Sequence, residues 1–300
     1  MLRQAALVKT FTARREPLPA ALAGQTVVET LTSRRTTEVL NFLAARPIHT
    51  VYMAGLIRDN GLVSPLNRGS FYGCRDSSGE LQGVGLIGHA MLFETRSDAA
   101  LATLAGVAKA CPEKTRFVMG EAKQIEKFWH HYSPSGADAR LLCSEMLLEL
   151  RWPVAVDEPV SGLRPATLAD LELIVPVHAE MSFAESGVNP LETDPDGFRQ
   201  RCARRVEQGR VWVWVQDGQL IFKADVISDT PEVVYVEGIY VDAEARGRGV
   251  GRRCMSHLCR QLLAHTRSVG VIVNVQNAPA QKLYKTVGFK HHSYYDTIYL

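Results

Sequence analysis

The sequence feature that most constrains the fold is a strand-like run that leads through a glycine-rich turn into a helix, over residues 233–251 (VVYVEGIYVDAEARGRGVG). Val, Ile and Tyr dominate Val233–Val241, which is the composition of a β-strand, and Gly238 in its middle is typical of a β-bulge. Glycine and arginine alternate over Arg246–Gly251, and apolar residues then recur at helical spacing at Val250, Cys254, Met255, Leu258, Leu262 and Leu263. The glycines are therefore predicted to lie at a strand-to-helix junction.

A glycine-rich turn before a helix favours a phosphate ligand, because backbone N–H groups and the positive end of the helix dipole are open to an anion. The turn is not a P-loop, since GxxxxGK[ST] does not occur in the sequence. It is not a dinucleotide fingerprint either, because Arg252 stands where GxGxxG needs its third glycine and no acid follows to bind a ribose.

The stretch that follows the turn is strongly basic. Between Ala245 and Tyr295 there is no Asp or Glu, whereas the chain average of 32 acids in 300 residues would place about five there. The same stretch contains nine basic residues, namely Arg246, Arg248, Arg252, Arg253, Arg260, Arg267, Lys282, Lys285 and Lys290. This charge favours a ligand with several phosphates and no ribose diol held by a carboxylate.

Two motifs in this half of the chain carry a resemblance to a known family. The run RGRGVG at Arg246–Gly251 matches the [QR]xxGx[GA] acyl-CoA signature of the GNAT acyltransferase superfamily. Downstream, NVQNAPAQKLYKTVGF at Asn274–Phe289 resembles that superfamily's closing pattern, NxxNxxAxxLYxxxGF. The two motifs occur in the family's order, one helix and one strand apart. The resemblance implies an acetyl-CoA-dependent N-acetyltransferase.

Composition places the chain among ordinary globular proteins. Three hundred residues that are 46% hydrophobic are enough for two domains with separate cores. The six cysteines show no CxxC or framework spacing, which favours reduced thiols and a cytoplasmic location. No apolar run approaches membrane-spanning length, so we expect no membrane association. The basic stretch at 1–25 is expected to be a loose N-terminus.

The chain is predicted to contain two α/β units. Residues 26–150 alternate strand and helix signals like a GNAT half, but at Phe93–Asp98 (FETRSD) no glycine turn follows the strand, and acids stand at Glu94 and Asp98. We therefore expect a degenerate GNAT-like domain that does not bind acyl-CoA. Residues 151–162 contain two prolines and little periodicity and are predicted to be the linker.

Residues 163–300 are predicted to form the catalytic GNAT domain. Their pattern is β-α-α-β-β-β-α-β-α-β, with a hairpin signal at Asp217-Gly218. The predicted fold class is thus mixed α/β: tandem GNAT-like folds, each a mostly antiparallel twisted sheet flanked by helices. The first half and the segment FKAD at Phe222–Asp225 together resemble two-part GNAT proteins with a degenerate acetyltransferase-like N-terminal domain.

The chemistry of acyl transfer to an amine assigns two catalytic candidates. An amine of lysine type has a pKa of about 10.4, so a base must accept its proton. Glu237 is the single carboxylate of the predicted strand Val233–Val241, and apolar neighbours would raise its pKa. We therefore expect it to be the general base. The alternative is a carboxylate in a structural ion pair. Tyr284 matches the family's tyrosine and is expected to be the general acid; the alternative is a core aromatic. A backbone N–H freed at Gly238 or Ile239 would stabilise the oxyanion.

The resemblance also implies a set of ligand-binding residues. Backbone amides of Arg248–Gly251 would hold the pyrophosphate, Arg246 would lie beside it, and Arg252 or Arg253 would approach the 3′-phosphate. Asn277 would contact the pantetheine or cap its helix. The cofactor-binding set is Ile239, Tyr240, Val241, Arg246, Gly247, Arg248, Gly249, Val250, Gly251, Arg252, Asn274, Asn277 and Ala280. The acceptor is expected to bind near His178, Glu180 and Glu185.

Three functions remain open from the sequence. The first is an acetyl-CoA-dependent N-acetyltransferase for a small-molecule or peptide amine. The second is an acyl-CoA-binding regulatory module without turnover. The third is nucleic-acid binding through the basic C-terminal stretch, which the glycine turn disfavours because a basic groove needs no glycines. We expect acetyl-CoA as co-substrate, no metal, no nucleic-acid partner and a possible homodimer.

Overall fold

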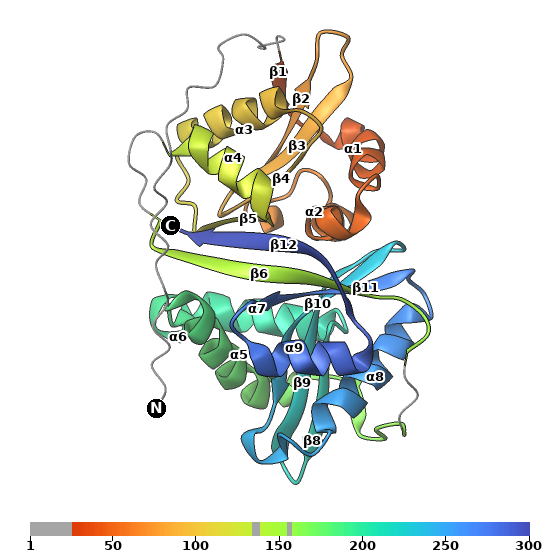
Figure 1. Cartoon of the computed structure of the whole chain (residues 1–300). Helices are drawn as coiled ribbons and strands as arrows, with labels where there is room; N and C mark the ends of the chain where they lie inside the picture. The colour runs from red at the N-terminus through yellow and green to blue at the C-terminus, as the bar shows by residue number, and fades with distance from the viewer. Residues whose placement is uncertain (1–25, 134–138, 155–157) are drawn as a thin grey trace. The chain divides into compact units, whose positions relative to one another are not determined.

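The computed structural model describes residues 26–133, 139–154 and 158–300 (Figure 1). Contacts divide them into two compact units. The first contains the described residues up to Glu145 together with Ser293–Leu300, and the second contains those from Met146 to His292. This division differs from the expected boundaries at residues 150 and 163, and it assigns the last eight residues to the first unit. The predicted loose N-terminus, 1–25, lies outside the described residues.

The first unit is a mixed sheet between two pairs of helices (Figure 1). Its strands follow the order β1-β2-β3-β4-β5-β12, with antiparallel pairs throughout except for the parallel pair β4–β5. The strands are β1 (Val27–Thr30), β2 (Gly69–Arg75), β3 (Leu81–Gly88), β4 (Ala90–Thr95), β5 (Phe117–Glu121) and β12 (Lys290–Tyr299). The helices are α1 (Thr36–Leu43), α2 (Pro47–Asn60), α3 (Asp98–Ala110) and α4 (Ala122–Tyr132).

Local sequence explains most of these elements. Pro47 occupies the first turn of α2, where its missing N–H costs nothing, and the Ser97 side chain caps α3 by accepting a hydrogen bond from the Ala100 amide. Residues 81–95 form two strands, β3 and β4, which are separated at His89. A Cβ at Gly88 would lie 2.4 Å from the Gly69 backbone, so this break depends on a close approach that the residue pattern does not reveal.

The second unit repeats the same plan. The ladders β7–β8, β8–β9 and β9–β10 are antiparallel, and β10–β11 is parallel. The strands are β7 (Leu163–Pro165), β8 (Val211–Gln216), β9 (Gln219–Asp229), β10 (Val233–Val241) and β11 (Ser268–Asn274); β6 (Leu141–Leu150) begins in the first unit and ends in this one. The helices are α5 (Leu171–Ser186), α6 (Pro190–Thr193), α7 (Pro195–Glu207), α8 (Val250–Leu263) and α9 (Ala278–Val287).

Two hydrophobic cores cover the two faces of this second sheet. Helices α8 and α9 pack on one face, where Phe222, Val236 and Met255 are fully buried. Helices α5 and α7 pack on the other, around Ile174 and Val213. Thr167 and Asp170 form a capping box before α5. Asp217 and Gly218 both have positive φ (50° and 75°), as a type I′ hairpin turn requires.

Candidate functional site

The site begins at a β-bulge in the middle of β10. Glu237 pairs with Asp225 and Tyr240 with Lys223, so Gly238 and Ile239 together oppose the single residue between those partners. Gly238 has φ +60°, and a Cβ there would lie 2.5 Å from Asp225 Oδ2. The bulge predicted from the sequence is confirmed, and it requires glycine for both its backbone conformation and its space.

Strand β10 loses its parallel partner just before the bulge. Among the described residues the ladder with β11 covers three pairs and ends at Tyr235 opposite Gly270, while the ladder with β9 continues to Val241. The backbone of Ile239–Val241 is therefore paired on one side only. Apart from the Val241 carbonyl, which accepts from Arg246 Nε, the amide and carbonyl groups on the other side are available to an extended ligand.

The glycine turn follows β10 and opens onto α8. A 3₁₀ turn (Ala243–Ala245) leads to Gly247 and Gly249, whose φ angles of +73° and +78° favour glycine. Gly249 is the N-cap of α8 and supplies no side-chain cap, so the first-turn amides face outward without a side-chain acceptor. No heavy atom lies within 4 Å of a Cβ built at either glycine. The turn has the open helix N-terminus that an anion needs.

Arginines surround this turn and are exposed. Arg246 Nε donates to the Val241 carbonyl at 2.9 Å, which ties the turn to the end of β10. Arg248 and Arg252 are exposed and Arg253 is half-buried. Gly251 packs closely, since a Cβ there would lie 3.2 Å from Val241 Cγ2.

A pair of carboxylates lies near the bulge. Tyr235 donates to Glu237 Oε1 at 2.7 Å, and burial raises the pKa of Glu237 above its usual value although this hydrogen bond acts in the opposite direction. Glu185 is exposed at the end of α5, yet desolvation by nearby protein atoms, and next the charge of Glu237, raises its pKa to about 7. The two carboxylates therefore resist simultaneous ionisation.

Tyr284 belongs to the same site. It lies on α9, is 5% exposed and packs edge-on against Phe289 at 5.5 Å between ring centroids. Burial raises the pKa of its phenol, and negative charge on Glu237 and Glu185 raises it further. The phenol therefore stays protonated at neutral pH. The structure thus brings together Glu237, Tyr284 and Glu185, which come from three different elements.

Comparison with known proteins identifies this half of the chain. Residues 177–289 match the family model of the acetyltransferase (GNAT) family. The chain contains a GNAT domain. The predicted resemblance is confirmed over the segment that carries the bulge, the glycine turn and Tyr284.

Solved GNAT structures share the fold at low sequence identity. An acetyltransferase from the GNAT family of Colwellia psychrerythraea is 12% identical, with a TM-score of 0.55 over 91% of this chain and 99% of that one. A tandem GNAT protein from the clavulanic acid biosynthesis pathway is 15% identical, with a TM-score of 0.56 and coverage of 91% and 98%. A GCN5-related N-acetyltransferase from Sphaerobacter thermophilus is 13% identical, with a TM-score of 0.55 and coverage of 91% and 94%.

These likenesses confirm the predicted fold class, a mixed α/β architecture of GNAT type. The comparison with curated proteins found no match. No helix among the described residues is both long enough and apolar enough to cross a membrane.

In the GNAT domain the two asparagines of the closing motif act on the backbone. Asn277 is the N-cap of α9, where its Oδ1 accepts from the Ala280 amide at 3.1 Å. Asn274 Oδ1 accepts from the Gln276 amide at 2.8 Å, and its carbonyl accepts from Gln281. Ala280 packs against the core on the same helix. These contacts position α9 and hence Tyr284.

A buried ion pair next to the bulge of β10 is a feature that was not predicted from the sequence. Lys223 Nζ lies 2.6 Å from Asp225 Oδ2 and donates to the Gly238 carbonyl at 3.2 Å, and both side chains are at most 1% exposed. Asp225 Oδ1 has no hydrogen-bond partner among the described atoms. The signal was present in FKAD, where a lysine and an acid interrupt an apolar strand.

The predicted acceptor residues of the GNAT domain occupy different environments. His178 lies on α5 with Nδ1 3.8 Å from Asp225 Oδ2 and from Cys202 Sγ, and burial followed by the charge of Lys223 lowers its pKa to about 3. It is therefore neutral and directed at the ion pair. Glu180 is exposed on the same helix. Of the three, Glu185 is electrostatically coupled to Glu237.

Proposed function

We propose that the second unit is an acetyl-CoA-dependent N-acetyltransferase that acts on a primary amine. The observation that carries this proposal is the sequence of features along one strand: a bulge with a carboxylate at Glu237, unpaired backbone beyond it, and a helix capped by Gly249. The family match over 177–289 supports the reaction class.

The residues around the glycine turn fit acetyl-CoA. First-turn amides of α8, from Val250 to Arg252, would hold the pyrophosphate, and Arg246 and Arg248 would add positive charge beside it. The free edge of Ile239–Val241 would pair with the pantetheine amides. When bound, acetyl-CoA supplies the thioester acetyl group that is transferred.

Proton transfers at the proposed site are assigned to Glu237 and Tyr284. Glu237, with its raised pKa, would accept a proton from the acceptor ammonium directly or through water, which frees the nitrogen lone pair for attack on the acetyl carbonyl. A backbone N–H near Gly238 or Ile239 would stabilise the oxyanion. Tyr284, kept protonated, would donate its proton to the sulfur as the carbon–sulfur bond breaks. The nitrogen would release its second proton to solvent, from which Tyr284 is reprotonated, and the amide product and free thiol result.

The acceptor is expected to carry positive charge as it arrives. Glu185, and Glu180 on the same helix, provide carboxylates at the acceptor side, and neutral His178 adds no competing charge. A primary ammonium offsets the repulsion between Glu185 and Glu237 and so binds where it loses its proton. This favours an amine over an alcohol or thiol acceptor.

The runner-up function is an acyl-CoA-binding regulatory module without turnover. Its supporting observation is that Tyr284 is deeply packed in the core, as a structural aromatic would be. Both functions require acetyl-CoA binding at the glycine turn, and they differ in the appearance of free thiol.

The deciding experiment measures free CoA thiol with a panel of primary amines. Wild-type protein should release thiol with at least one amine, and Glu237→Gln should lower kcat by about 10²- to 10⁴-fold while acetyl-CoA affinity in calorimetry stays within about twofold. The matched control is Glu207→Gln, an exposed glutamate at the end of α7, which should keep full activity. Tight acetyl-CoA binding with no thiol release for any amine would establish the regulatory module instead.

We infer that the first unit does not bind acyl-CoA. At the equivalent helix start the Ser97 side chain already accepts from Ala100 N at 3.2 Å, and Asp98 places a negative charge in the first turn of α3. Both features oppose a phosphate. Calorimetry should give one acetyl-CoA per chain, and a stoichiometry of two would contradict this assignment.

A further inference from the structure

The first unit contains a small cavity where β4 and β5 diverge. These parallel strands pair at Ala90–Phe117 and Met91–Val118, and the cavity of about 30 Å³ is lined by the residues that follow on each strand. Its lining includes Phe93 and Glu94 of β4 and Met119 and Glu121 of β5. Helices α2 and α4 and strand β12 contribute His49, Tyr52, Met53, Gln124 and Tyr295. The cavity therefore results from the divergence of two paired strands of the sheet.

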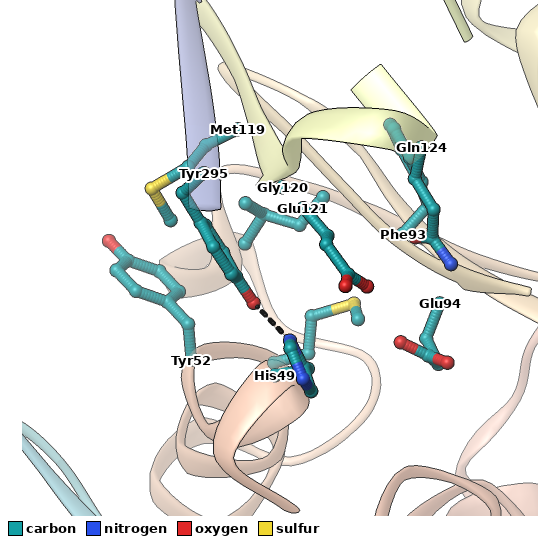
Figure 2. A pocket seen from close by; sticks show the side chains of 11 residues that line it. His49, Tyr52, Phe93, Glu94, Met119, Gly120, Glu121, Gln124 and Tyr295 are labelled. Carbon is teal, nitrogen blue, oxygen red and sulfur yellow. Dashed lines mark hydrogen bonds between the residues drawn. The ribbon is translucent and has the colours of Figure 1, made fainter. Parts of the chain in front are cut away.

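The polar groups of the lining converge on this space. Figure 2 shows the carboxylates of Glu94 and Glu121 on one side of it and the His49–Tyr295 pair on another. His49 Nδ1 and the Tyr295 hydroxyl lie 2.8 Å apart, and the two rings stack at 5.8 Å. Tyr295 is 5% exposed and Glu94 is 7% exposed, so both belong to the interior.

The lining is rich in acidic groups. Among the described residues it contains two carboxylates and one histidine, His49, and no lysine or arginine. Arg46, which is not one of the lining residues, holds both from outside: Nη1 lies 3.1 Å from Glu94 Oε1 and Nη2 lies 2.7 Å from Glu121 Oε2. Arg96, the other cation near Glu94, pairs with Glu80. One guanidinium therefore serves two carboxylates.

The shifted pKa of Glu94 agrees with the sharing of one guanidinium between two carboxylates. Burial raises its pKa, and the neighbouring charge of Glu121 raises it as well, although Arg46 acts in the opposite direction. A positive charge placed in the cavity would favour the ionised carboxylate and relieve both effects. A buried charge without sufficient compensation is costly, so such a ligand would bind favourably.

The apolar part of the lining selects the kind of cation. Tyr52, Phe93 and Tyr295 provide aromatic rings, and Met53 and Met119 provide thioethers. Aromatic faces attract organic cations, and thioethers pack against methylene groups. A strongly hydrated inorganic ion prefers a shell made of oxygen ligands alone, whereas rings and thioethers make up much of this lining.

We propose that this cavity, lined by Glu94, Glu121 and three aromatic rings, binds the primary ammonium end of a small alkylamine. A volume of about 30 Å³ admits a terminal methylene and its ammonium and is too small for a quaternary trimethylammonium group. The Glu121 side chain keeps 29% of its surface accessible, so the alkyl chain can leave beside it. This site lies in the first unit and does not depend on acyl transfer by the second.

The test is ligand-observed NMR titration of the full chain with n-butylammonium chloride. Wild-type protein should bind it, with n-butanol and tetramethylammonium each at least tenfold weaker, at ionic strength matched with KCl. Glu121→Gln should weaken n-butylammonium binding at least tenfold. A thermal unfolding midpoint near the wild-type value would show that the variant is folded.

A second variant fills the cavity with a charged side chain of the protein itself. Gln124 lines it from α4 and points toward the carboxylates (Figure 2). Gln124→Lys should place a tethered ammonium there, abolish n-butylammonium binding and raise the unfolding midpoint. Gln124→Met, of similar length and uncharged, is the matched control and should not raise the midpoint.

The variant Glu185→Gln distinguishes amine binding in the second unit from amine binding in the cavity, because Glu185 does not line the cavity. Glu185→Gln is expected to weaken acceptor binding in the second unit, so the n-butylammonium binding that this variant retains should come from the cavity and should be lost when Glu121→Gln is added. Binding that is lost in Glu185→Gln and kept in Glu121→Gln would overturn the proposal, as would equal binding of n-butanol.

Discussion

At the scale of single residues, the candidate site is a set of ionisable groups that alter one another. Glu237 and Glu185 lie on different elements, and each makes ionisation of the other harder. Burial keeps Tyr284 protonated and His178 neutral, so the site has proton acceptors and a proton donor at the same pH. Such opposed shifts are typical of acid–base sites.

The first prediction concerns pH dependence. A base acts once it has lost its proton, so turnover should increase as the pH rises through the pKa of Glu237, which burial holds above the usual value of a glutamate. Glu185→Gln removes the charge that opposes ionisation of Glu237, so the acidic limb of the kcat profile should move to lower pH. The measurement is the kcat–pH profile of both proteins from pH 5 to 9. An unmoved limb would show that the two carboxylates are not coupled.

At the scale of elements, two glycines in one strand–turn–helix unit have different physical reasons. Gly249 has positive φ with open space around it, and Gly238 has positive φ and no room for a side chain. The first leaves a helix N-terminus free for an anion, and the second lets the bulge rest against Lys223 and Asp225. Substitutions at the two positions should therefore fail in different ways.

Gly249→Glu tests the phosphate turn. The new carboxylate would face the bound pyrophosphate, so acetyl-CoA affinity in calorimetry should fall at least 100-fold. Gly209→Glu is the matched control, because Gly209 also has positive φ (+68°) and open space but follows α7. Both variants should lose about 1–2 kcal/mol of stability from the left-handed backbone. Equal acetyl-CoA affinities in the two variants would refute the assignment of the turn.

Gly238→Ala tests the bulge. Its methyl group would lie 2.5 Å from Asp225 Oδ2 and 3.0 Å from Lys223 Nζ, so the buried pair must shift. Urea unfolding should show a larger loss of stability than in Gly209→Ala, which carries the backbone strain alone. The kcat should also fall, because Glu237 and the oxyanion amide move with the bulge. Equal stability of the two variants would mean that the bulge tolerates a side chain.

At the scale of the whole molecule, the chain contains two units built on one plan and the last strand completes the first of them. Strand β12 pairs with β5 over Tyr295–Tyr299, and Tyr295 and Ile298 are 5% and 1% exposed. The C-terminal residues are therefore part of the core of the first unit, although the preceding helix, α9, belongs to the second.

Removal of residues 293–300 should destabilise the protein strongly. The deletion exposes an edge of β5 and removes Tyr295 and Ile298 from the core, each about 1.5–3 kcal/mol of buried apolar surface. The urea midpoint should fall accordingly. Removal of Leu300 alone is the control and should have a small effect. An unchanged midpoint after the larger deletion would show that β12 contributes little to the first unit.

The sequence by itself determined the features that depend on neighbours along the chain. Val233–Gly251 encodes strand, bulge and glycine turn because β-propensity, side-chain volume and backbone freedom are local properties, and Ser97 and Asp217-Gly218 encode a cap and a turn for the same reason. The family resemblance followed from two such motifs.

Only the tertiary structure decided which distant residues meet. The coupling of Glu185 to Glu237, the Lys223–Asp225 pair under the bulge, and the assignment of 293–300 to the first unit all depend on packing between elements far apart in sequence. The cavity between β4 and β5 is of the same kind, because its two carboxylates come from different strands and its rings come from α2, β4 and β12. Strand pairing and burial set these contacts, and neither is encoded in the spacing of residues along one segment.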